Sequence, residues 1–220
     1  EYGYMKFGNG CWLQKEGIEC FAPQEAYFVN RNDHEVVICA PTHHIAHRGD
    51  TLGGINLTIR ITAPAEDVIR VQTSHYLGVE DHSPKFDLNM DENRAMDVEE
   101  TEDEILVRSG NLSLRINKKN WSMSYERDGK VLTASSGRDL AYMRTQWTGF
   151  AYDMDSEGKA YMRQQLGIDV NEHVYGLGER FGALVRNGQS VDIWNEDGGT
   201  STDQSYKNIP FYLTDKGYGV

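Results

Sequence analysis

A short segment late in the chain combines the residue types with which proteins hold sugars. Trp194, Asn195 and Asp197 stand within four residues of one another, and Gly198 and Gly199 follow directly. Glycines allow the backbone to fold tightly, so that a carboxylate and an amide can point the same way. A carboxylate can accept two sugar hydroxyls, and an indole offers apolar area to the C–H face of a pyranose ring. We therefore select Trp194, Asn195 and Asp197 as candidate substrate-binding residues.

These residue types also permit a purely structural interpretation. Asn195 and Asp197 could close an Asx turn, in which their side chains bond only to nearby backbone. Two further blocks flank the segment and bear on this choice. One runs from Val174 to Phe181 and reads Val-Tyr-Gly-Leu-Gly-Glu-Arg-Phe, and the other runs from Tyr206 to Phe211 and reads Tyr-Lys-Asn-Ile-Pro-Phe.

In this order and at this spacing, the three blocks resemble the amino-terminal region of glycoside hydrolase family 31, the α-glucosidases and α-xylosidases. The resemblance is strongest to the bacterial α-xylosidases. It is dense from about Glu172 to Val220 and can be traced back to Trp12. The resemblance favours the binding role for Asp197, because in similar enzymes the aspartate at this place reaches into the mouth of the catalytic barrel and helps to bind substrate.

The same resemblance implies where catalysis occurs. Family-31 enzymes are retaining, and such enzymes use two carboxyl groups about 5 Å apart across the scissile bond. In similar proteins both groups lie on a (β/α) barrel beyond the point that matches Val220, so we expect no catalytic residue in this chain and no activity from it alone. The implied partners are an α-linked xyloside or glucoside and the barrel of the same protein. Similar α-xylosidases assemble into multimers, so a homo-oligomer is an open expectation.

Two other groups of residues could be taken for chemistry. Glu179 and Arg180 could form an acid–base pair, but we expect a buried or interfacial ion pair. Gly176 and Gly178 are consistent with a strand pressed against another domain.

His43 and His47 are four residues apart and would share a helix face, as zinc ligands do. Pro41 precedes them and the motif holds no glutamate, so we expect a loop, with no metal and no cofactor.

Composition narrows the class of partner. The 220 residues include 34 acidic and 22 basic side chains, and the formal net charge is −12. Such a chain repels phosphate backbones and anionic lipid headgroups, so we expect neither nucleic acid nor membrane as a partner. We find no apolar run of membrane-spanning length and no basic-then-apolar export signal, which favours the cytoplasm. The acidic run from Asp91 to Glu104 is expected to be a solvated loop. The cysteines lack paired spacing and are expected to be reduced thiols; they are Cys11, Cys20 and Cys39.

Alternation of apolar and polar residues indicates an all-β fold. Leu112–Ile116 and Trp121–Tyr125 alternate on either side of a short break, which predicts a hairpin, and Asp128-Gly129 predicts a second turn before Val131. Short strands at intervals near ten residues are typical of a sandwich or barrel. The further strands that we expect are Ala26–Asn30, Glu35–Ala40, Ile55–Thr62, Val68–Ser74, Glu104–Arg108, Gly149–Met154 and Ile209–Thr214.

We therefore predict one antiparallel β-sandwich domain over residues 1–220, which the resemblance specifies as a galactose-mutarotase-like supersandwich. Residues 215–217 predict a turn, after which a return strand stops at Val220. A hairpin cut in its second arm leaves unpaired backbone groups, so we expect the sandwich to be truncated near its C-terminus.

Two functions from other classes remain open. A stand-alone carbohydrate-binding module would share the sandwich and the aromatic residues. An aldose epimerase on the same fold would need a histidine and a carboxylate that converge as acid and base.

Overall fold

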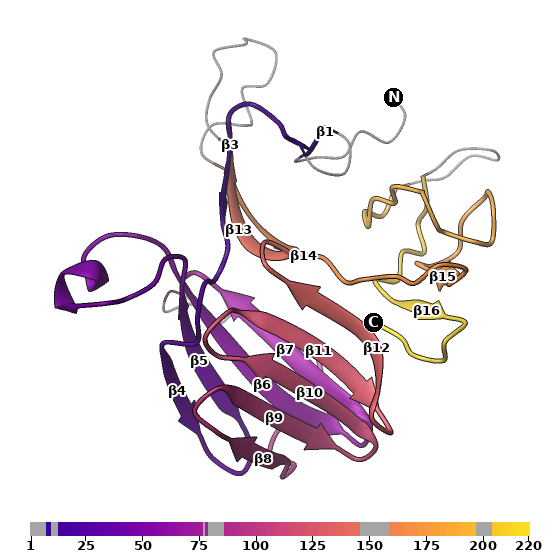
Figure 1. Cartoon of the computed structure of the whole chain (residues 1–220). Coiled ribbons are helices and arrows are strands. Elements are labelled where there is room, and N and C mark those ends of the chain that lie inside the picture. The colour runs from indigo at the N-terminus through magenta and orange to yellow at the C-terminus, as the bar shows by residue number, and fades with distance from the viewer. Residues whose placement is uncertain (1–7, 10–12, 77, 79–85, 146–158, 197–203) are drawn as a thin grey trace. The chain divides into compact units, whose positions relative to one another are not determined.

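The computed structural model describes residues 8–9, 13–76, 78, 86–145, 159–196 and 204–220. These residues fall into two compact units. The larger unit is Gly17–Gly167, and the smaller unit combines Glu1–Glu16 with Ile168–Val220. Antiparallel strands dominate both units, so the predicted all-β class is confirmed (Figure 1).

The larger unit contains a β-sandwich, as predicted. Two antiparallel sheets form its layers, and the five-stranded sheet lies in front of the four-stranded sheet in Figure 1. The four-stranded sheet has the order β4-β5-β6-β7 and consists of Phe28–Arg31, Val36–Pro41, Asn56–Ala65 and Val68–Ser74. The five-stranded sheet has the order β12-β11-β10-β9-β8, and its strands from β8 to β12 are Asp97–Glu100, Glu104–Ser109, Leu112–Asn117, Ser122–Arg127 and Lys130–Ser136.

The period-two pattern of the strands creates the core between these sheets. In β9, Ile105 and Val107 are fully buried, while Glu104, Leu106 and Arg108 are partly exposed. Burial of each such side chain contributes about 1.5–3 kcal/mol relative to exposure. The buried cluster draws residues from both layers, among them Val36, Ile38, Ile59, Ile61, Ile105, Val107, Leu114, Ile116 and Met123.

The two predicted hairpins of the five-stranded sheet are confirmed. Asp128 and Gly129 have φ values of 52° and 73°, as a two-residue turn between β11 and β12 requires. Between β10 and β11, the Asn117 side chain accepts hydrogen bonds from the backbone N–H groups of Lys119 at 3.0 Å and Asn120 at 2.9 Å. The local sequence therefore sets both turns.

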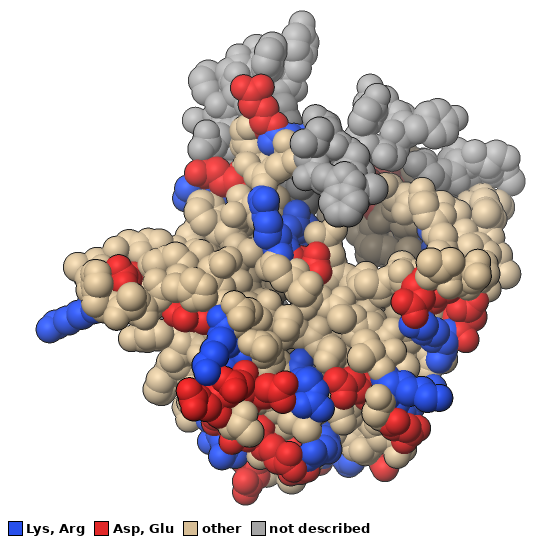
Figure 2. Space-filling view, viewed as in Figure 1, with Lys and Arg blue, Asp and Glu red and all other residues tan. Residues whose placement is uncertain are grey.

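The acidic run differs from the predicted solvated loop, because its residues 97–100 form edge strand β8. Arg108 on the neighbouring strand lies 2.6 Å from Asp97 and 2.9 Å from Glu99. This hydrogen-bonded cation holds the pKa of Glu99 below its ordinary value. Figure 2 shows basic side chains interleaved with acidic ones over this part of the sandwich. The paired charges allow an acidic segment to serve as a strand.

A third sheet in the larger unit was not predicted. It has the order β14-β13-β3 and consists of Ala160–Gln164, Leu140–Thr145 and Ile18–Phe21. The predicted strand Gly149–Met154 lies outside the described residues. Cys20 and Cys39 are free thiols, as expected, and Cys11 also lies outside the described residues.

The histidine segment contains a short 3₁₀ helix, η1, over Arg48–Thr51. His47 caps this helix, because its Nδ1 accepts the Gly49 N–H at 3.1 Å. His43 Nε2 lies 2.7 Å from the carbonyl oxygen of Asp50. Among the described residues, no three His, Cys, Asp or Glu side chains are grouped as metal ligands, and no helix is long and apolar enough to cross a membrane.

The smaller unit contains short antiparallel strand pairs. Strand β15, Val174–Gly176, pairs with β16, Tyr212–Thr214, and the pair β1–β2 is Gly8–Asn9 and Leu13–Gln14. Strand β16 is shorter than the predicted Ile209–Thr214. The predicted turn and return are confirmed, because Val220 exchanges backbone hydrogen bonds of 2.8 and 2.9 Å with Tyr212.

Candidate substrate-binding loop

The glycines of the first block let two segments of the smaller unit approach closely. Gly176 and Gly178 have φ values of 114° and 91°, which side-chain-bearing residues rarely adopt. A Cβ atom at Gly178 would lie 2.1 Å from the carbonyl oxygen of Lys207, and one at Gly176 would lie 2.8 Å from that of Phe211. The glycines therefore pack the first block against the third block, within one unit. Packing of this strand against another domain stays a prediction.

Backbone hydrogen bonds hold this contact together. The Leu177 N–H donates to the carbonyl oxygen of Phe211 at 2.9 Å, and the Glu179 N–H donates to that of Lys207 at 3.0 Å. Leu177 also has a positive φ of 69°. The segment after β15 is thus fixed along the segment before β16.

Arg180 connects three parts of the unit. Its Nε donates to the carbonyl oxygen of Leu177 at 3.0 Å, and its Nη2 donates to the carbonyl oxygen of Asp192 at 2.7 Å. The same Nη2 also donates to Oδ1 of Asn208. A planar guanidinium suits this role because its donors have fixed directions.

Asn208 gathers the residues that begin and follow the middle block. Its Nδ2 lies 2.7 Å from the carbonyl oxygens of both Trp194 and Ser205, and 2.9 Å from Oδ1 of Asn195. Its backbone N–H also faces Oδ1 of Asn195 at 3.3 Å. The resemblance gave Asn208 no role, although it lies in a block that the resemblance uses. Only its position in the fold reveals the role.

The two ends of the middle block are joined to each other. The Glu196 N–H donates to the carbonyl oxygen of Ser205 at 3.0 Å, and the Gln204 side-chain amide donates to the Glu196 carboxylate at 2.9 Å. Ser205 is buried, and its hydroxyl donates to the carbonyl oxygen of Glu179 at 2.6 Å. Glu196, Gln204 and Ser205 are therefore joined in one hydrogen-bond network.

The three candidate residues are placed as follows. The Trp194 side chain is 72% exposed, so its indole is available to a ligand. Asn195 is exposed as well, but its Oδ1 accepts the two hydrogen bonds from Asn208, which leaves its Nδ2 as the group to offer a sugar. Asp197 lies outside the described residues. Of the three, the structure brings Trp194 and Asn195 together in one anchored segment.

Glu179 has a different partner from the adjacent arginine that the sequence suggested. Its carboxylate lies 2.7 Å from Nζ of Lys207, and both side chains are more than 60% exposed. The hydrogen bond that the Lys207 ammonium donates to this carboxylate raises the pKa of Lys207. An exposed pair of this kind contributes little to stability. We therefore assign Glu179 to the surface of the unit.

A buried carboxylate lies beside the paired strands β15 and β16. The Glu172 side chain is 1% exposed, and it accepts the Asp169 N–H at 2.8 Å. Burial opposes ionisation, but this hydrogen bond and the nearby Lys216 ammonium hold the pKa of Glu172 below its ordinary value. Asn187 bonds to the carbonyl oxygen of Glu172 and to the N–H of Val174, each at 2.8 Å.

Comparison with known proteins supports the interpretation of these blocks. The chain is 38% identical over 219 residues to an α-xylosidase of Lactiplantibacillus pentosus, and 38% identical over 227 residues to an α-xylosidase of Emericella nidulans. Each match includes 98% of this chain, which spans 27% and 29% of the lengths of these relatives. An α-glucosidase of Bacillus thermoamyloliquefaciens is 26% identical over 53% of this chain and 14% of its own length.

Solved structures share the fold. The cycloalternan-forming enzyme of Listeria monocytogenes matches 92% of this chain with 17% of its own, at 18% identity and a TM-score of 0.67. A family-31 dextranase of Flavobacterium johnsoniae matches 89% of this chain with 22% of its own, at 19% identity and a TM-score of 0.63. At these identities the similarity shows the fold alone.

A family match covers most of the chain and includes all three blocks. Residues 58–220 match the glycosyl hydrolase 31 N-terminal galactose mutarotase-like domain. This match and the sandwich topology confirm the resemblance and the fold class that the sequence indicated. The chain therefore belongs to glycoside hydrolase family 31, as an N-terminal galactose mutarotase-like domain.

Proposed function

We propose that residues 1–220 form the non-catalytic amino-terminal domain of a cytoplasmic α-xylosidase, and that the segment 194–197 binds the substrate of this enzyme. The single observation that carries the proposal is the anchored segment with its exposed indole. Trp194 is 72% exposed, so its indole is available to a ligand or to a neighbouring domain. The hydrogen bonds of Asn208 hold the backbone of Trp194 in place before any ligand binds.

Relatives support the substrate class. Two α-xylosidases are 38% identical over almost the whole chain, whereas the α-glucosidase is 26% identical over about half of it. We therefore favour an α-linked xyloside over an α-linked glucoside. The retaining mechanism of such enzymes needs two carboxyl groups about 5 Å apart, and we assign this pair to a barrel outside residues 1–220.

The substrate role has a defined chemistry. The indole of Trp194 would cover the C–H face of a sugar ring, while Nδ2 of Asn195 donates to a hydroxyl and the carboxylate of Asp197 accepts from one or two others. None of these groups forms or breaks a covalent bond. They act by holding the ring at the rim of a pocket whose acid and nucleophile lie elsewhere.

An activity assay tests this division of labour. The full-length enzyme that contains this domain is expected to hydrolyse an aryl α-xyloside faster than the corresponding α-glucoside, and the 220-residue chain should hydrolyse neither. Hydrolysis by the isolated chain would contradict the proposal, and so would a full-length protein that prefers the glucoside. Mutarotation by the isolated chain, followed by polarimetry, would instead assign it to the aldose epimerases.

A further inference from the structure

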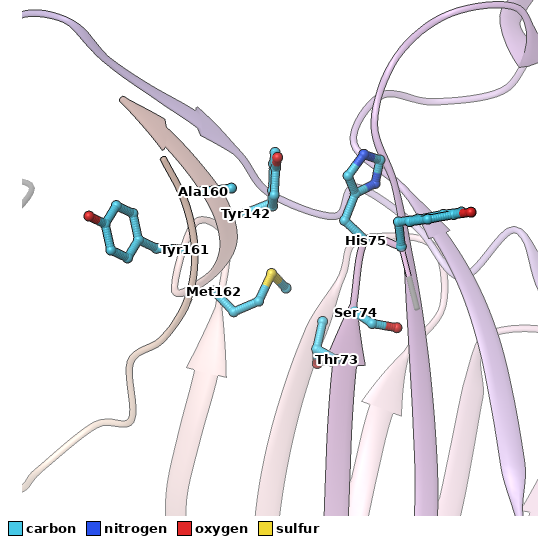
Figure 3. A pocket seen from close by; sticks show the side chains of 8 residues that line it. Thr73, Ser74, His75, Tyr142, Ala160, Tyr161 and Met162 are labelled. Atoms are coloured by element: carbon cyan, nitrogen blue, oxygen red, sulfur yellow. The ribbon is translucent and has the colours of Figure 1, made fainter. Parts of the chain in front are cut away.

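A hollow lies within the larger unit, between the end of β7 and strand β14. Its volume is about 350 Å³, near the lower end of the range of small-molecule sites. Figure 3 shows its walls: Thr73 and His75 on one side, and Tyr142 and Met162 on the other. The full lining is Thr73, Ser74, His75, Tyr76, Tyr142, Ala160, Tyr161 and Met162.

The wall formed by β13 and β14 is set by strand pairing. Tyr142 and Met162 are direct cross-strand partners, so their side chains lie next to each other on one face of the sheet. Tyr161 alternates to the opposite face, and its ring points away from His75 in Figure 3. The hollow therefore has one wall of a tyrosine and a methionine, on a backbone that the ladder fixes.

The opposite wall presents hydrogen-bonding groups. His75 Nδ1 lies 3.1 Å from the carbonyl oxygen of Asn56, which can only accept, so Nδ1 must carry the proton. In the neutral ring, Nε2 is then a free acceptor for a ligand hydroxyl. The hydroxyls of Thr73 and Ser74 add groups that can donate or accept. The His75 and Tyr142 rings contact each other at 4.8 Å between centroids, which holds the imidazole in place.

Tyr76, one of the lining residues, is largely exposed to solvent. Tyr76 is 85% exposed, compared with 60% for Tyr206 and 52% for Tyr27. A tyrosine ring offers a rigid apolar face at a low entropy cost. A sugar ring presents C–H groups on its face and O–H groups around it. The tyrosine ring suits the C–H face, and the hydroxyl and imidazole groups of the lining suit the O–H groups.

The charge of the lining selects against ionic ligands. None of the eight lining residues is an acid, a lysine or an arginine, and the whole chain has a net charge of −12. An anion would find no cation to pair with and a repulsive overall field, and a cation would find no carboxylate in the lining. A neutral ligand with both hydroxyls and an apolar face fits these conditions.

We propose that this hollow is a second sugar-binding site, which takes one pyranose ring of a neutral glycoside. Tyr76 stacks on the C–H face of the ring, while Nε2 of His75 and the hydroxyls of Thr73 and Ser74 bond to its O–H groups. All residues of this site belong to the larger unit, whereas the Trp194 segment belongs to the smaller unit. Its role is to hold a glycoside on the sandwich and not to cleave it.

Titration of the 220-residue chain with methyl α-xyloside, followed by calorimetry or by saturation-transfer NMR, tests the site. Saturable binding near 1 mM is expected, which corresponds to about −4 kcal/mol. Tyr76→Ala should weaken it about threefold to tenfold, in line with the value of an aromatic contact. Tyr27→Ala is the matched control, because Tyr27 is also exposed, at 52%, and is not part of the lining. It should leave the affinity unchanged.

A second variant of the lining separates this site from the Trp194 segment. Thr73→Val removes a hydroxyl of the hollow and should also weaken the binding of methyl α-xyloside. Full binding in both Tyr76→Ala and Thr73→Val would overturn the proposal and support the loop instead. No saturable binding by the parent chain, or equal weakening by Tyr27→Ala, would overturn it as well. The melting temperature of each variant shows that a loss is not due to unfolding.

Discussion

The side-chain amide of Asn208 donates a hydrogen bond to the carbonyl oxygen of Trp194 at 2.7 Å. This contact joins residues that are 14 positions apart. It fixes the backbone of Trp194, whose indole is exposed. A loop of several residues would otherwise lose conformational entropy on binding a ligand. Asn208 therefore acts as a positioning residue, which prepares the segment before the substrate arrives.

Replacing Asn208 should loosen both ends of the segment that contains Asp197. In Asn208→Ala, the carbonyl oxygens of Trp194 and Ser205 lose their shared donor. We expect faster amide hydrogen exchange at residues 194–196 and 205–208. Asn187→Ala removes another asparagine of the same unit, and it should speed exchange near Glu172 and Val174 instead. The same exchange pattern in both variants would contradict a specific role for Asn208.

The close approach at Gly178 predicts a large effect for a single methyl group. In Gly178→Ala, the new Cβ would meet the carbonyl oxygen of Lys207 at a φ of 91°. We expect a loss of more than about 3 kcal/mol, from overpacking and backbone strain together. Gly182→Ala is the control, because its φ is 120° and nothing lies within 4 Å of a Cβ there. Gly182→Ala introduces backbone strain without overpacking, so it should lower the free energy of unfolding by about 1–3 kcal/mol.

Thermal unfolding of both variants measures this difference. If Gly178→Ala is too unstable to purify, its soluble yield relative to Gly182→Ala provides the same ranking. Equal melting temperatures for the two variants would show that the contact with Lys207 can relax at no cost.

Much of the sandwich could be predicted because one face of each strand is buried. Strand β7 has the predicted bounds, Val68–Ser74, and β9 and β10 differ from the prediction by one residue. Strand β13 was missed because adjacent residues, Leu140 and Ala141, are both buried, which removes the alternation. Strand β8 was missed because its acidic residues are paired across the sheet by Arg108, and local sequence does not show that contact.

The site was predictable in its residue types and not in its connections. The aromatic and acidic residues of the middle block, and the glycines before it, stand out in the sequence. The partner of Glu179 is Lys207, 28 residues later, and Asn208 acts on residues 13 and 14 positions away. Such pairings depend on the antiparallel path from β15 to β16. The hollow beside Tyr76 likewise needs residues from two sheets that no local pattern connects.

The lowered pKa of Glu172 predicts a pH-dependent contribution to stability. A carboxylate whose pKa is lower in the folded state stabilises the fold above its unfolded value, which is 4.5, and this stabilisation is lost as the pH falls through the folded value. Glu172→Gln should therefore reduce stability by about 1–3 kcal/mol at pH 7. The difference from the parent chain should shrink as the pH falls below 4.5.

Melting temperatures between pH 3 and pH 8 measure this dependence. Glu102→Gln is the matched control, because that side chain is 87% exposed and pairs only with the exposed Lys119. It should change the melting temperature little at any pH in this range. A Glu172→Gln difference that stays constant with pH would mean that the charge of Glu172 does not contribute.

The central claim is that this domain lends a substrate-binding residue to chemistry performed elsewhere, and the kinetics of Asp197→Ala in the full-length enzyme test it most directly. With an aryl α-xyloside, KM should rise while kcat stays within about threefold of the parent value, because the residue holds the substrate and takes no part in bond cleavage. Glu102→Ala is the control, because that side chain is 87% exposed on the larger unit, and it should change neither constant. An unchanged KM in Asp197→Ala, or a fall in kcat of several orders of magnitude at constant KM, would contradict the account.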